Sequence, residues 1–191
     1  MGSMFQATFR LNWTDMANSK LLNWIHFTWD LTRLSQSGVR TPEHYRIAPA
    51  TGEDEAELRK VIMASFLLDP AWNPAINEVT SMVDAWLDRA FASTTGTCLA
   101  LRHGLRIIGA AVLSFDPAAN NHLMPGPCIL SEYRNRGFGT QLLESSLARL
   151  REAGLSRATG IARENAPVSR FLYPKFSSTS TPAEILPALA A

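Results

Sequence analysis

The sequence predicts an α/β (α+β) fold in which helices flank a mixed, mostly antiparallel central sheet. Three long segments repeat apolar residues at helical spacing, and the short apolar segments between them are bounded by turn-forming residues, as strands are. The order along the chain is strand, two helices, three strands, helix, strand and short helix. This order mixes hairpins with a β-α-β unit. At 191 residues the chain is long enough for one domain, or one domain with an extension.

A strand and two helices come first. Residues 44–49 (HYRIAP) predict a short strand, and Thr51 and Asp54 then match the capping-box pattern that opens a helix. The apolar face of this helix consists of Leu58, Val61, Ile62 and Phe66. After a break at 68–74, a second amphipathic helix has its apolar residues at helical spacing, namely Val79, Val83, Trp86 and Ala90.

A hairpin and a further strand follow. Residues 97–101 and 105–115 are both strand-like, and they flank a short turn that contains His103 and Gly104. Residues 126–133 (GPCILSEY) predict the next strand.

The last predicted elements are a helix, a strand and a short helix. The first helix runs from Gly139 to Ala153 and ends at Gly154, a common helix terminator. Its apolar face consists of Leu143, Leu147 and Leu150. Residues 155–162 predict a strand. Pro167 suits the first turn of the short helix, and Pro174 ends it.

Residues 1–43 are interpreted as an N-terminal extension of unclear role, and residues 44–191 as the domain. Within the extension, alternating apolar residues over 5–13 predict a strand. Residues 21–34 fit a helix or a strand equally well, and residues 35–43 are typical of a linker.

The composition excludes several classes of partner. A net charge of +1 favours neither nucleic acid nor a membrane surface. No apolar run reaches the roughly 18 residues of a membrane span, and no signal-peptide pattern is present. Two cysteines are too few for a disulfide framework, and no Cys/His spacing predicts a metal site. We therefore expect a cytoplasmic protein that holds no metal.

The distribution of charge is more informative than the total. Residues 134–170 contain seven arginines against three acidic residues, whereas residues 51–90 contain eight acidic residues against three basic ones. An anionic ligand would therefore bind residues 134–170, and a cationic acceptor would bind residues 51–90. Solvated helix faces would produce the same counts.

The segment SEYRNRGFGTQLL (131–143) predicts a site for a diphosphate. It joins a strand to a helix through a turn that contains two glycines, Gly137 and Gly139, and two arginines, Arg134 and Arg136. The first backbone N–H groups of a helix lack intrahelical partners and lie at the positive end of its dipole, which suits phosphate. The glycines let a phosphate approach the backbone closely, and the arginines add charge-assisted hydrogen bonds. The alternative is an ordinary glycine turn with surface arginines.

Two common phosphate-binding patterns do not fit this segment. The P-loop requires a lysine that is absent, and the dinucleotide fingerprint requires a third glycine where the chain has Leu142. The pattern that fits is R-x-x-G-x-G, over Arg134, Gly137 and Gly139. With the preceding strand and the leucine-patterned helix, it resembles the coenzyme A pyrophosphate loop of the GNAT family, the GCN5-related N-acetyltransferases. The resemblance covers about residues 44–176.

The resemblance implies a function and a set of site residues. The function is transfer of an acetyl group from acetyl-CoA to a primary amine, by direct attack in a ternary complex. Main-chain groups of the strand would bind the pantetheine arm, the loop would bind the pyrophosphate, and an asparagine after the next strand would contact the coenzyme. The matching residues are Cys128, Ile129, Arg134, Asn135, Arg136, Gly137, Phe138, Gly139, Thr140 and Asn165. Tyr173 would be the catalytic acid that protonates the departing thiolate, since a tyrosine keeps its proton at neutral pH.

The sequence departs from the family pattern near its end. The family places the tyrosine seven residues after the asparagine, but Leu172 has that spacing and Tyr173 comes one residue later. One residue corresponds to about 100° around a helix, so Tyr173 would point elsewhere unless the helix entry is shifted. The tail 177–191 is also short for the closing pair of strands. Residues 1–43, or a partner chain in a homodimer, would then complete the sheet edge.

No carboxylate stands at the family's usual position for a general base. His122 is the histidine to test in that role. These departures leave a second hypothesis open, in which a GNAT-like module binds acyl-CoA as a sensor or structural ligand without turnover.

Overall fold

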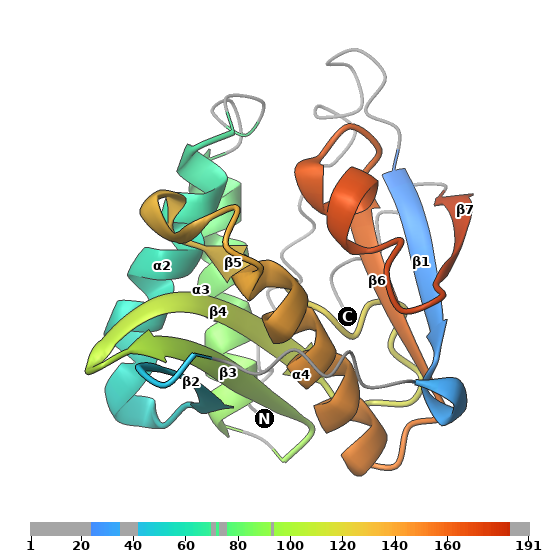
Figure 1. The fold of residues 1–191 in the computed structure, drawn as a ribbon, viewed down its shortest axis with the longest axis horizontal. Helices are drawn as coiled ribbons and strands as arrows, with labels where there is room; N and C mark the ends of the chain where they lie inside the picture. The colour runs from blue at the N-terminus through green and yellow to red at the C-terminus, as the bar shows by residue number, and fades with distance from the viewer. Residues whose placement is uncertain (1–23, 35–41, 70–71, 73–75, 93, 184–191) are drawn as a thin grey trace, which may run out of the picture.

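The computed structural model describes residues 24–34, 42–69, 72, 76–92 and 94–183, and the strands of this part form two antiparallel sheets (Figure 1). The first sheet has the order β2-β3-β4-β5, and the second has the order β6-β1-β7. The predicted fold class is confirmed: mostly antiparallel strands are flanked by helices. The strands are hydrogen-bonded as two sheets, however, rather than as one central sheet.

The four-stranded sheet contains the predicted hairpin. Its strands are β2 (Tyr45–Pro49), β3 (Gly96–His103), β4 (Arg106–Ser114) and β5 (Cys128–Ile129). β5 is much shorter than the strand expected over 126–133. The prolines at 125 and 127 have no N–H to donate, and residues 131–133 turn into a 3₁₀ helix, so regular pairing is confined to two residues.

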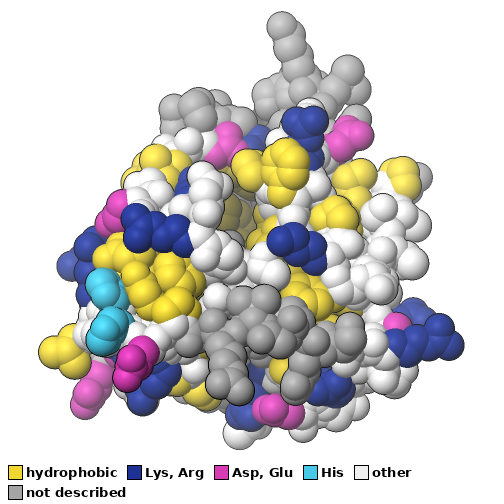
Figure 2. All heavy atoms as spheres, in the orientation of Figure 1, with side chains coloured by type: hydrophobic (Ala, Val, Ile, Leu, Met, Phe, Trp, Pro, Cys, Tyr) yellow, Lys and Arg dark blue, Asp and Glu magenta, His cyan; other side chains and the backbone are white. Residues whose placement is uncertain are grey.

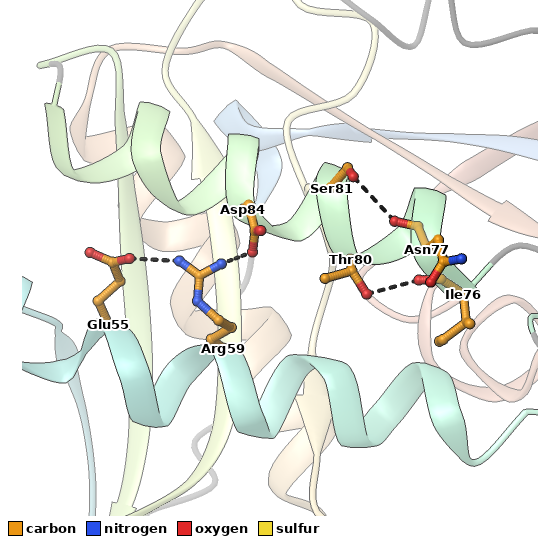
Figure 3. Close-up of polar contacts among 7 residues, drawn as sticks. All are labelled: Glu55, Arg59, Ile76, Asn77, Thr80, Ser81 and Asp84. Atoms are coloured by element: carbon orange, nitrogen blue, oxygen red, sulfur yellow. Dashed lines mark hydrogen bonds and ion pairs between the residues drawn. The ribbon is translucent and has the colours of Figure 1, made fainter.

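Helices α2 (Glu55–Leu67) and α3 (Ile76–Ala92) cover one face of this sheet (Figure 1). Their buried side chains pack on the β3 and β4 residues that point to that face, such as Ala100 and Ala110. The predicted capping box is present, since the Thr51 N–H donates to Asp54 Oδ2 at 2.9 Å. Arg59 of α2 joins the two helices: it pairs with Glu55 one turn earlier and with Asp84 of α3 (Figure 3).

Helix α4 (Phe138–Glu152) covers the opposite face of the same sheet (Figure 1). The predicted leucines are buried there, against the β3 and β4 side chains that alternate with those facing α2 and α3. The four-stranded sheet is therefore the middle layer of three.

The second sheet places an N-terminal strand between two C-terminal ones. β1 (Trp24–Asp30) pairs antiparallel with β6 (Arg157–Arg163) on one side and with β7 (Thr179–Ala183) on the other. The segment left open between helix and strand is thus a strand, and residues of this chain, rather than a partner, pair with the edge of β6. The boundary expected at residue 44 stays a prediction, although β1 precedes it and belongs to the sheet.

Some expectations fall outside the described residues. These are the strand over 5–13, most of the linker over 35–43, and the end of the tail, 184–191. Within the described residues, no helix is long and apolar enough to cross a membrane.

The two sheets meet at one end and separate at the other. At the joined end, the His122 N–H donates to the Thr159 carbonyl of β6 at 2.9 Å, and the His122 carbonyl accepts from Ser114 of β4 at 3.0 Å. Further along the chain, β5 pairs with β4 and belongs to a different sheet from β6. The side of β5 that faces away from β4 is therefore a free sheet edge.

Candidate functional site

The loop before α4 presents the start of the helix to solvent. Gly137 is the N-cap residue and has a φ of 82°, a conformation that glycine adopts without strain. Its carbonyl accepts from the N–H groups of Thr140 and Gln141 at 3.0 and 3.1 Å. Because these are the first bonds of the helix, the amides of Phe138 and Gly139 have no intrahelical acceptor. A Cβ on Gly137 would meet no atom within 4 Å, so the space beside the loop is open.

The two arginines of the loop are directed toward the strand side. Arg134 Nε donates to the Ile129 carbonyl at 2.9 Å, and the Arg136 guanidinium lies 5.6 Å from the centre of the Tyr133 ring. Tyr133 belongs to an aromatic cluster with His103 and Tyr45. Figure 2 shows hydrophobic, histidine and basic side chains close together on one face of the molecule. The expected contribution of these arginines to phosphate binding stays a prediction.

Lys175 lies at the start of α4, although the sequence analysis did not select it. Its Nζ donates to Thr140 Oγ1 at 2.9 Å. The sequence feature that could have identified Lys175 is its position two residues after Tyr173, at the end of the last short helix. The structure therefore brings a lysine from the C-terminal part of the chain to the glycine loop.

The register of β5 determines which main-chain groups of Ile129 are free. The Leu130 N–H donates to the Ile108 carbonyl at 3.0 Å, and Cys128 is paired with Ala110. Alternate residues of an antiparallel strand point their polar groups to opposite sides, so the N–H and C=O of Ile129 face away from β4. The carbonyl accepts from Arg134, and the N–H lies on the open edge of β5.

Cys128 is a packed thiol. It is buried, and burial raises the pKa of its thiol to about 11. The thiol is therefore protonated near neutral pH and is a poor nucleophile.

Tyr173 is held in the core despite its unusual spacing. Residues Val168–Leu172 form a π-helical segment, and the Tyr173 N–H donates to the Val168 carbonyl, five residues back, at 2.8 Å. This wider turn accommodates the extra residue between Asn165 and Tyr173. The side chain is 2% exposed, and its ring packs edge-on against Phe27 and Trp29 of β1. Burial raises the pKa of the hydroxyl above its usual value.

The hydroxyl of Tyr173 reaches the chain just before β5. A Cβ built on Gly126 would overlap the Tyr173 oxygen, and it would lie 3.0 Å from Tyr173 Cζ. Glycine at 126 therefore leaves the space that the hydroxyl occupies, two residues before Cys128. Asn165, by contrast, lies in the exposed turn between β6 and the π-helical segment.

A second set of contacts joins the α2–α3 connection to the other sheet. Arg163 at the end of β6 pairs with Asp69, and its guanidinium lies 4.9 Å from the centre of the Trp72 ring. Trp72 also packs edge-on against Phe66 of α2 and Trp24 of β1. The sequence analysis did not select Arg163, because nothing local to the chain connects it with residue 69.

His122 joins the two sheets and is not exposed as a base would be. Its side chain is 3% exposed, and Nδ1 accepts from the Thr159 N–H at 3.1 Å. A neutral ring that accepts at Nδ1 carries its proton on Nε2, which has no partner among the described residues. Burial lowers the pKa of this histidine, although the nearby Asp116 opposes the effect. Among the described residues, no three His, Cys, Asp or Glu side chains converge as a metal site.

We expect His122 to make stability depend on pH. A lowered pKa in the folded state means that the unfolded chain binds the proton more readily. The stabilisation is therefore complete above the unfolded value of about 6.5 and is lost as the pH falls below it, by at most about 1.4 kcal/mol per pH unit. Urea unfolding between pH 5.5 and 8 would measure this dependence. It should be weaker in His122→Gln and unchanged in the control His44→Gln, whose side chain is exposed. Equal slopes in all three proteins would contradict the assignment.

We also expect Gly126 and Tyr173 to be coupled in stability. Gly126→Ala should cost about 1–3 kcal/mol, as overpacking does, because the new methyl group displaces the hydroxyl. The same substitution should cost less in a Tyr173→Phe background, where the overlapping oxygen is absent. Chemical denaturation of the four proteins gives the coupling energy. Additive costs would show that the hydroxyl does not lie against residue 126.

Comparison with known proteins supports the resemblance found in the sequence. The profile of the acetyltransferase (GNAT) family matches residues 59–176, which is more than half of the chain. A comparison with curated proteins gives no match.

Solved structures share the fold at low sequence identity. A putative GNAT acetyltransferase from Novosphingobium aromaticivorans has a TM-score of 0.55 and 15% identity, covering 84% of this chain and 60% of its own. A GCN5-related N-acetyltransferase from Kribbella flavida has a TM-score of 0.55 and 12% identity, covering 84% and 55%. A conserved protein of unknown function from Staphylococcus epidermidis has a TM-score of 0.59 and 11% identity, covering 95% and 66%.

The chain thus spans less than two thirds of the length of each of these three proteins. At these identities the likeness concerns the fold, and the family profile carries the assignment. On that match, this chain belongs to the acetyltransferase (GNAT) family.

Proposed function

We propose that this protein transfers an acetyl group from acetyl-CoA to a primary amine by direct attack in a ternary complex. Membership of the acetyltransferase (GNAT) family supports acetyl transfer in general terms. The observation that carries the proposal is the pairing of two features in one region: the exposed start of α4 and the open edge of β5 with the free Ile129 N–H.

The residues at the start of α4 and on β5 fit two parts of acetyl-CoA, the pyrophosphate and the pantetheine arm. The open space beside Gly137 and the unpartnered amides at the start of α4 suit a pyrophosphate. The main-chain groups of Cys128 and Ile129 belong to the strand whose edge would pair with the pantetheine arm. The pyrophosphate would be held by Asn135, Arg136, Gly137, Phe138, Gly139 and Thr140, with Arg134 alongside. Asn165 would contact the outer part of the coenzyme from its exposed turn.

Acetyl-CoA supplies the activated thioester when it is bound. The chain's own contribution to the chemistry would come from two groups. The Ile129 N–H can donate to a carbonyl oxygen on which negative charge develops. The Tyr173 hydroxyl is protonated near neutral pH and would donate its proton to a departing thiolate, although burial raises its pKa and makes it a weaker acid than an exposed tyrosine. Cys128, which is protonated and buried, takes no part as a nucleophile.

The alternative is a module that binds acyl-CoA without turnover. The burial of Tyr173 favours this alternative, because a hydroxyl that is enclosed by the core would serve packing instead of proton transfer. The identity of the amine, a cytoplasmic location and a homodimer stay predictions.

Donor binding provides the first test. Calorimetric titration should detect binding of acetyl-CoA to the parent protein. Gly139→Val should weaken binding at least about tenfold, because a branched side chain at the second residue of α4 would crowd a phosphate at the helix start. The chain itself has room for the change, since the nearest atom, of Leu172, lies 3.6 Å from the new Cβ. Gly52→Val is the matched control: it lies in a separate exposed turn where a Cβ meets no atom within 4 Å, and it should bind normally. Failure of the parent to bind acetyl-CoA would refute both the enzyme and the sensor.

The role of Tyr173 provides the second test. Tyr173→Phe keeps the ring packing but removes the proton, so turnover should fall about 10²-fold or more while the Kd for acetyl-CoA is unchanged. A thiol-release assay with a panel of primary amines measures turnover. Unchanged turnover would mean that Tyr173 is a packing residue. Binding of acetyl-CoA without turnover on any amine would favour the sensor.

A further inference from the structure

We propose that Lys175 binds the pyrophosphate of the donor, at the position beside α4 that the loop arginines were expected to fill. This inference rests on the proposed function, because it concerns the same site. It adds a residue that the R-x-x-G-x-G motif does not include.

The first argument concerns the contacts that the arginines make. Arg134 donates its Nε–H to the Ile129 carbonyl, and the Arg136 guanidinium packs over the Tyr133 ring. Both contacts lie on the strand side of the loop, before the helix begins. Neither is a contact with the first turn of α4, where the unpartnered amides lie.

The second argument concerns the ammonium group of Lys175. It lies against Thr140 Oγ1 at the positive end of the α4 dipole, which is an unfavourable place for a cation. An ammonium has three N–H donors, and the one recorded here meets a neutral hydroxyl. None of the ion pairs among the described residues includes Lys175. An anion at the start of α4 would relieve the repulsion and accept from the remaining donors.

The third argument concerns how firmly the backbone of Lys175 is held. Its carbonyl accepts from Trp29 Nε1 at 3.1 Å, and its N–H donates to the Leu172 carbonyl at 3.1 Å. The preceding residues are Pro174, with a fixed φ, and Tyr173, which is anchored in the core. These contacts hold the backbone at residue 175 in place, so that the lysine side chain lies at the start of α4.

The partner of Lys175 is assigned as the pyrophosphate rather than the 3′-phosphate of coenzyme A. Lys175 contacts Thr140 within the first turn of α4, which also carries the unpartnered amides. Because Thr140 accepts from the lysine, its own hydroxyl hydrogen remains free to donate to the same phosphate.

The principal experiment compares affinities for coenzyme A by calorimetry. Lys175→Ala should weaken binding about tenfold or more, as expected for loss of a charged hydrogen bond, and Lys175→Arg should restore part of it. Lys60→Ala, on the exposed surface of α2, is the matched control and should bind like the parent. The loss in Lys175→Ala should exceed that in Arg136→Ala. The reverse order, or normal binding by Lys175→Ala, would overturn the inference while leaving the proposed function intact.

A second arm identifies the phosphate. The affinity loss in Lys175→Ala should be the same for coenzyme A and for dephospho-coenzyme A, which lacks the 3′-phosphate. A loss confined to coenzyme A would refute the pyrophosphate assignment.

A third experiment uses chemical labelling of the parent protein instead of a comparison of affinities between variants. An amine-acylating reagent followed by peptide mass mapping should show that coenzyme A protects Lys175 but not Lys60. Without ligand, Lys175→Ala should melt no lower than the parent, because it removes a cation from a helix N-terminus. Equal labelling of Lys175 with and without coenzyme A, in a protein that binds coenzyme A, would overturn the inference.

Discussion

The packing of one tryptophan of β1 against Tyr173 is the contact on which the arrangement of the site depends. Trp29 is completely buried, and its ring meets the Tyr173 ring at 5.1 Å between centres. Its indole N–H also fixes the backbone at Lys175. A Cβ on Gly160 of β6 would lie 3.1 Å from the same ring, which is closer than ordinary van der Waals contact, so a side chain there would push the ring aside. A single buried side chain thus sets the position of the segment that carries both Tyr173 and Lys175.

The separation of the two sheets has an equally specific physical basis. His122 ties β4 to β6 at one end, and the Asp69–Arg163 pair with Trp72 joins the α2–α3 connection to β6. Between these contacts, the prolines around Gly126 cannot supply N–H donors, and β5 is reduced to two paired residues. The free edge at Ile129 is the result. An open strand edge beside a helix N-terminus offers main-chain donors to a ligand that is both extended and anionic.

The positive potential at the start of α4 comes from the backbone of the helix, and Lys175 lies beside it. The loop glycines allow the N-cap conformation, and the helix dipole provides the positive potential. Arg134 donates to the Ile129 carbonyl and Arg136 lies over the Tyr133 ring, and their contribution to phosphate binding stays a prediction. The structure places the cation of Lys175 within hydrogen-bonding distance of Thr140 at that helix start.

The sequence by itself determined the local elements. Helices α2, α3 and α4, the β3–β4 hairpin and the glycine loop follow from apolar periodicity, capping and turn residues, which act over a few positions. Only the tertiary structure decided which strand lies between β6 and β7, because alternation of apolar and polar residues predicts a strand but not the strands with which it pairs. It also decided the π-helical turn that leads Tyr173 into the core, and the directions of Arg134, Arg136 and Lys175. These depend on contacts between residues far apart in the chain, which no local pattern encodes.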